Sequence, residues 1–87
     1  MSYQVEWSRQ AIRNMRRLDK PLVHRITEAV ETFAQTGYGD VKLLTASGGV
    51  YRLRVGDWRV RFRIQDGEIQ IMLIQAVLPR GEAYKRM

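Results

Sequence analysis

The stretch that decides the fold is YRLRVGDWRVRFRI, residues 51–64, which contains five arginines and a single acid. Apolar side chains alternate with polar ones on both sides of Gly56-Asp57, and a period of two is typical of half-buried strands. A two-residue connection with glycine first suits a type II′ turn, because only glycine adopts the required positive φ without steric cost. The sequence therefore predicts a β-hairpin. Its predicted facing pairs are Val55–Trp58, Arg54–Arg59, Leu53–Val60 and Arg52–Arg61.

This hairpin would gather all of its arginines on one face, which we call the arginine face. Its members are Arg52, Arg54, Arg59, Arg61 and Arg63. Like charges directly opposite one another across strands are destabilising, by roughly 0.2–1 kcal/mol per pair. We therefore expect the arginine face to receive an anion. The alternative is a solvated strand face, on which arginine supplies a long apolar stem and solubility.

The composition describes a small, basic chain. Its 87 residues include 15 Lys+Arg against nine Asp+Glu, which gives a net charge of +6, and twelve of the basic residues are arginine. Arginine binds phosphate and carboxylate in bidentate geometry, so a nucleic acid or a strongly acidic protein is the expected partner. With no cysteine and one histidine, His24, we expect neither a metal nor another cofactor. No stretch is typical of a signal peptide or a membrane span, so we expect a cytoplasmic protein without a membrane partner.

The first half of the chain is predicted to contain a short strand over residues 3–7, where apolar and polar residues alternate, followed by helices. Ser8 and Asp19 are good N-cap residues, and apolar side chains follow each of them at helical spacing. Gly37 is expected to end the second helix. These signals predict a helical hairpin.

The pattern of residues in the second half of the chain predicts β-strands. Residues 37–49 are expected to be a loop with a brief extended piece around 42–44. After the arginine hairpin, Asp66-Gly67 is typical of a type I′ turn and leads into a strand over residues 68–77 that is apolar on both faces. Pairing through that turn predicts two apolar neighbours on the arginine face, namely Met72 beside Arg61 and Ile74 beside Arg59.

The predicted order is β-α-α-β-β-β in a single domain, residues 1–87. The fold class is α+β, with an N-terminal strand, a helical hairpin and then three antiparallel strands, and with the helices on one face of the sheet.

The C-terminal sequence LPRGEAYKRM places Arg80 and Tyr84 four residues apart. At this spacing both side chains would share one helical face and lean over the end of the arginine hairpin. A tyrosine that simply packs against the sheet is the alternative. Together with the strand order, YRLRVGDWRVRFRI and PRGEAYKR resemble the RelE/ParE superfamily of bacterial toxins from type II toxin–antitoxin pairs, and the resemblance covers nearly the whole chain.

The resemblance to the RelE-like branch implies a small ribonuclease that enters the ribosomal A site, cuts mRNA and inhibits translation. It also implies a cognate, at least partly acidic antitoxin that forms a hetero-oligomer with the toxin. A ParE-like inhibitor of DNA gyrase and a non-catalytic RNA-binding module are the alternatives. The expected enzyme is a metal-independent endoribonuclease, in which the 2′-OH of the RNA attacks the adjacent phosphate.

Site residues are carried over by position. Arg52 and Arg54 match the two basic residues of the RelE-type second strand, where lysines are common, and Arg59 matches the arginine that opens the next strand. Arg80 and Tyr84 match the C-terminal arginine and tyrosine, although Pro79 stands where many relatives have histidine. The arginines would stabilise the transition state, and Tyr84 would act as general base or as a platform for a stacked base. The expected RNA-binding residues are Arg61, Arg63, Lys85 and Arg86.

Overall fold

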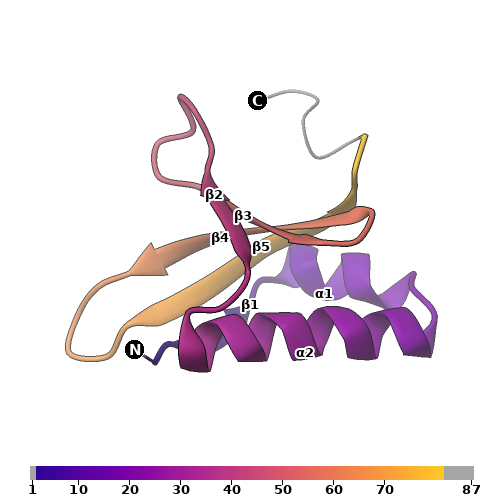
Figure 1. Cartoon of the computed structure of the whole chain (residues 1–87), viewed down its shortest axis with the longest axis horizontal. Helices are drawn as coiled ribbons and strands as arrows, with labels where there is room; N and C mark the ends of the chain where they lie inside the picture. The colour runs from indigo at the N-terminus through magenta and orange to yellow at the C-terminus, as the bar shows by residue number, and fades with distance from the viewer. Residues whose placement is uncertain (1, 82–87) are drawn as a thin grey trace.

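A computed structural model describes residues 2–81 and contains a five-stranded mixed sheet with two helices on one face (Figure 1). The elements are β1 (Gln4–Trp7), α1 (Arg9–Arg16), α2 (Lys20–Thr36), β2 (Asp40–Leu43), β3 (Tyr51–Val55), β4 (Trp58–Gln65) and β5 (Ile71–Pro79). The strand order is β1-β5-β4-β3-β2, with β1 parallel to β5 and every other pair antiparallel. The predicted α+β class, with the helices on one face, is confirmed.

The helix boundaries follow the predicted caps. The Ser8 hydroxyl oxygen accepts a hydrogen bond from the Ala11 amide at 3.1 Å, and an Asp19 carboxylate oxygen accepts one from the Leu22 amide at 3.0 Å. Each bond satisfies an amide that would otherwise lack a partner in the first helical turn. Gly37 ends α2 in the left-handed conformation with φ 80°.

The arginine hairpin has the predicted register. Its pairs include Val55–Trp58, Arg54–Arg59, Leu53–Val60 and Arg52–Arg61. Gly56 has φ 59°, whereas within residues 2–81 the only non-glycine residue with a positive φ is Ala46. A positive φ at the first central residue alone is the pattern of a type II′ turn. The local sequence was therefore sufficient to predict this element.

The segment expected to be a loop contains an additional strand, β2, which pairs with β3 at the edge of the sheet. The extended piece predicted around residues 42–44 thus begins two residues earlier, at Asp40. Four residues alone carry little strand signal, and β2 is held by ladder bonds to a strand that follows only after a further loop. This pairing places Asp40 opposite Arg54 and Lys42 opposite Arg52.

The prediction for the last hairpin was wrong. The connection runs over residues 66–70, so Gln65 faces Ile71, whereas a two-residue turn at Asp66-Gly67 would place Glu68 there. The difference from Glu68 to Ile71 is three residues, and an odd shift moves every side chain to the opposite face of the sheet. Gln70 bridges the longer connection by donating from its amide nitrogen to the Asp66 carboxylate at 2.8 Å.

Met72 and Ile74 consequently lie in the core with 0% of their surface exposed, opposite Ile64 and Phe62. Burying each such side chain contributes roughly 1.5–3 kcal/mol, which favours the observed register over one that turns both toward the arginine face. A β-bulge follows, since the pairing shifts between Arg61 and Phe62. The β5 residues that face the arginines are Leu73, Ala76 and Leu78.

The core lies between the helices and the sheet. Its fully buried members include Ile26, Val30, Leu53, Val60, Phe62, Met72, Ile74 and Val77. The Phe62 ring stacks on Tyr51 at a centroid distance of 5.5 Å and is tilted against Phe33 at the same distance. His24 lies on the surface of α2, beside Glu28. Among the described helices, none has the length and hydropathy needed to cross a membrane.

Candidate functional site

The arginine face lies on the side of the sheet away from the helices. Leu53, Val60 and Phe62 point into the core and are buried, so the residues alternating with them along β3 and β4 point the other way. The loop that joins β2 to β3 rises from the sheet on this same side (Figure 1). Within residues 2–81, the arginine face is therefore bordered by a loop and covered by no helix.

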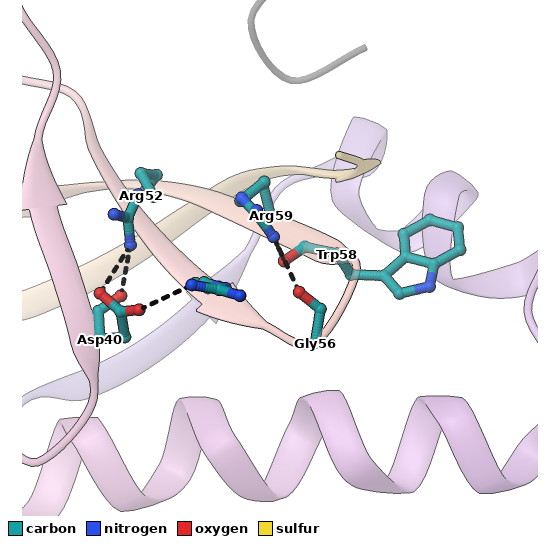
Figure 2. Close-up of polar contacts among 6 residues, drawn as sticks. Asp40, Arg52, Gly56, Trp58 and Arg59 are labelled. Carbon is teal, nitrogen blue, oxygen red and sulfur yellow. Dashed lines mark hydrogen bonds and ion pairs between the residues drawn. The ribbon is translucent and has the colours of Figure 1, made fainter. Parts of the chain in front are cut away.

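Asp40 contacts two members of the arginine face. Arg52 Nη1 donates to the Asp40 main-chain oxygen at 2.8 Å and to Asp40 Oδ1 at 2.9 Å (Figure 2). Arg54 Nη1 lies 3.9 Å from Asp40 Oδ2. The hydrogen bond from Arg52 is the main cause that holds the pKa of the Asp40 carboxyl below its usual value; desolvation opposes it, and the charges of Arg52, Arg54 and Arg59 lower the pKa further. Asp40 is therefore a carboxylate at neutral pH.

Arg59 is held by the turn of its own hairpin. Its side chain is buried, with 6% of the residue exposed, and Nη1 donates to the main-chain oxygens of Gly56 at 2.9 Å and Trp58 at 3.0 Å (Figure 2). Its Nε is also buried and has no hydrogen-bond partner among the described residues. The turn thus fixes the orientation of this guanidinium group, whose Nε–H has no acceptor within residues 2–81.

The other predicted site residues differ in their surroundings. Arg63 Nη1 donates to the Gly48 main-chain oxygen at 2.7 Å and so attaches the β2–β3 loop to the arginine face. Arg61 lies between Arg52 on β3 and Ala76 on β5. The Arg80 amide donates to the Asp57 main-chain oxygen at 2.8 Å, which places Arg80 beside the hairpin turn.

The remaining predicted residues, Tyr84, Lys85 and Arg86, lie outside the described residues. Within residues 2–81 there is no group of three or more His, Cys, Asp or Glu side chains arranged to hold a metal ion. Asp40 is the functional residue that the sequence-based prediction did not include. Its contact with Arg52 and Arg54 depends on the β2–β3 pairing, and no local motif indicates that pairing.

Comparison with known families identifies the chain. Residues 5–84 match the model of the ParE toxin of the type II toxin–antitoxin system parDE. The chain belongs to this family. The predicted membership of the RelE/ParE superfamily is thereby confirmed, and no curated protein matches the toxin's sequence.

Several solved structures share the fold of the toxin. The toxin is 26% identical to a chain of the archaeal RelE–RelB complex from Pyrococcus horikoshii OT3, with a TM-score of 0.74 and coverage of 93% of this chain and 98% of that one. It is 24% identical to a chain of the toxin–antitoxin complex RelBE2 from Mycobacterium tuberculosis, with a TM-score of 0.78 and coverage of 92% and 100%. An E. coli RelE variant with two arginines replaced by alanine, in the free state, is 16% identical, with a TM-score of 0.74 and coverage of 98% and 90%. The last two similarities show the shared fold.

Proposed function

We propose that this toxin is a ribosome-dependent mRNA endoribonuclease that inhibits translation and is controlled by a cognate antitoxin. The observation that carries the proposal is the arginine face, on which Arg52 and Arg59 are already oriented by short hydrogen bonds. Donors that are fixed before the reaction stabilise developing charge without reorganising, and removing one such donor typically costs roughly 3–4 kcal/mol of the activation free energy.

The reaction needs little from the protein beyond positioned charge. The RNA 2′-OH attacks the adjacent phosphorus and loses its proton, the bond from phosphorus to the 5′-oxygen breaks, and that oxygen takes up a proton. The products are a 2′,3′-cyclic phosphate and a 5′-OH. Arg52, Arg54, Arg59 and Arg80 would neutralise the charge that grows on the phosphorane oxygens, and Tyr84 would accept the 2′-OH proton.

The buried charge of Arg59 supports an anionic ligand. Burying a guanidinium group costs free energy, and the charge of a nearby phosphate would offset part of that cost. Arg61, Arg63, Lys85 and Arg86 are assigned to phosphates that flank the cleaved one. Because a phenol is a weak base at neutral pH, orientation of the message by the ribosome would supply much of the rate.

A partner antitoxin is part of the proposal. Two of the similar structures are complexes, namely the archaeal RelE–RelB complex and the toxin–antitoxin complex RelBE2. With a net charge of +6, the toxin favours an acidic partner, which would neutralise the arginine face. Such a complex should also bury apolar surface, because exposed charges are screened at moderate salt.

The chemistry of the cut ends tests the proposal. mRNA cut on ribosomes exposed to the toxin should carry 5′-OH and 2′,3′-cyclic or 3′-phosphate ends, and 5′-phosphate ends would refute attack by the 2′-OH. Arg54→Ala should slow cleavage strongly. Arg13→Ala is the matched control, because it removes the same charge from α1, on the other side of the sheet, where Arg13 donates a hydrogen bond to Gln10.

Inhibition of DNA gyrase is the second candidate, because the matching family model is that of the ParE toxin. The arginine face would then meet acidic protein or DNA, and Arg80 and Tyr84 would have no catalytic role. Intact mRNA together with gyrase-dependent DNA breaks would establish this alternative. RNA binding without either kind of cleavage would instead indicate a non-catalytic RNA-binding module.

A further inference from the structure

Asp40 is a carboxylate within a surface that otherwise attracts anions. It stands on the edge strand β2 directly opposite Arg54, and its neighbour across the diagonal is Arg52 (Figure 2). A carboxylate here reduces the positive potential that a phosphate would experience. Its presence therefore needs an explanation beyond surface solubility.

The two arginine contacts of Asp40 are unequal. Arg52 is bound at 2.8 and 2.9 Å through the main-chain oxygen and Oδ1, and only 14% of its side chain is exposed. Arg54 lies 3.9 Å from Oδ2, beyond hydrogen-bonding distance, and 56% of its side chain is exposed. Arg52 is thus held in one orientation, whereas Arg54 is attracted to Asp40 without being fixed.

We propose that Asp40 is a positioning residue with two effects: it holds Arg52 in place, and it is the counter-anion that Arg54 leaves when a phosphate binds the arginine face. This inference rests on the proposed binding of RNA phosphates by that face. A phosphate offers Arg54 several acceptor oxygens in bidentate geometry, which the contact with Asp40 does not provide. Arg52 keeps its bonds to Asp40 throughout.

Two substitutions at one position separate these effects. Asp40→Asn and Asp40→Ala both raise the net charge by one, but only asparagine retains a side-chain oxygen that accepts from Arg52. Asp40→Asn should bind a non-cleavable 2′-O-methyl RNA about threefold to tenfold more tightly than the unmodified toxin at low salt, because Arg54 then binds a phosphate without first leaving the charge of Asp40, 3.9 Å away. Asp40→Ala should lose most of that gain, because Arg52 is then held by the main-chain oxygen alone.

Two further variants control for charge and for Arg54. Glu31→Gln changes the net charge by the same amount at an exposed position of α2, on the other side of the sheet, and should alter RNA affinity less than twofold. In an Arg54→Ala background, Asp40→Asn should strengthen binding less than twofold, because the arginine that it releases is absent and only the change in charge remains. Thermal unfolding of each variant shows whether it is folded.

The outcomes are decisive in both directions. Equal RNA affinity of Asp40→Asn and the unmodified toxin, equal affinity of the Asn and Ala variants, or a gain that persists undiminished without Arg54 would overturn the inference. If Asp40→Ala does not fold, the Asp40→Asn comparison and the Arg54→Ala background still decide whether Asp40 is the counter-anion. If the expected affinity pattern appears while ribosome-bound mRNA stays intact, the ribonuclease proposal fails and the role of Asp40 stands.

Discussion

Replacing Gly56 with alanine should destabilise the fold by about 1–3 kcal/mol, because the hairpin turn requires a backbone conformation that L-residues rarely adopt. Gly56 has φ 59° at the first central position of the turn. A Cβ atom at this position would also lie 2.7 Å from Nη2 and 3.2 Å from Cζ of Arg25, which reaches the turn from α2.

The backbone should contribute most of this loss. Arg25 approaches Gly56 with the far end of a flexible side chain, so a rotation of that side chain can relieve the contact at small cost. The strain from the positive φ cannot be relieved without opening the turn. For a domain of this size, 1 kcal/mol shifts Tm by roughly 4–8 °C, so we expect Tm to fall by roughly 4–24 °C.

Thermal unfolding of Gly56→Ala, Arg25→Ala and the double variant separates the two causes. We expect Gly56→Ala to lower Tm by a similar amount whether or not Arg25 is present. An unchanged Tm in the single variant would refute the argument from φ, and recovery of Tm in the double variant would show that the contact with Arg25 decides instead. Because the Gly56 oxygen accepts from Arg59, cleavage should slow as well.

Three further outcomes are expected. Tyr84→Phe should retain ribosome affinity in co-sedimentation but lose most mRNA cleavage, since the ring remains while the proton acceptor is lost; full activity of this variant, with loss only in Tyr84→Ala, would assign Tyr84 to stacking. Phe62→Ala, at a fully buried position, should lower the free energy of unfolding in urea by about 3–5 kcal/mol, and a loss below about 1 kcal/mol would contradict the described core. Because the pKa of Asp40 is lowered in the folded state, its carboxylate stabilises the fold above the unfolded-state pKa, and that contribution disappears as pH falls through the folded-state pKa. Asp40→Asn should therefore have a lower Tm than the unmodified toxin at neutral pH and the same Tm in strong acid; a difference that persists in acid would show that the charge is not the cause.

The two hairpins show why one register was predictable and the other was not. Strands β3 and β4 alternate apolar and charged residues around a glycine-first turn, so a slip by one residue would bury arginines. Strand β5 is apolar on both faces, and its alternation does not distinguish the two faces. Its register depends on the connection over residues 66–70 and on the fit of Met72 and Ile74 into the core.

The sequence itself determined three features: the helix caps at Ser8 and Asp19, the glycine turn of the hairpin, and the position of the arginines on one face. Each of these features depends on residues that are close in the chain. Only the tertiary structure decided how Arg52 and Arg63 are held in place. Arg52 is fixed by Asp40, twelve residues away on an edge strand with little local signal, and Arg63 is fixed by the Gly48 oxygen of the adjoining loop. The acceptors of Arg59 lie in its own hairpin turn, whereas those of Arg52 and Arg63 are brought by the fold from another strand and a loop, and spacing along the chain does not specify them.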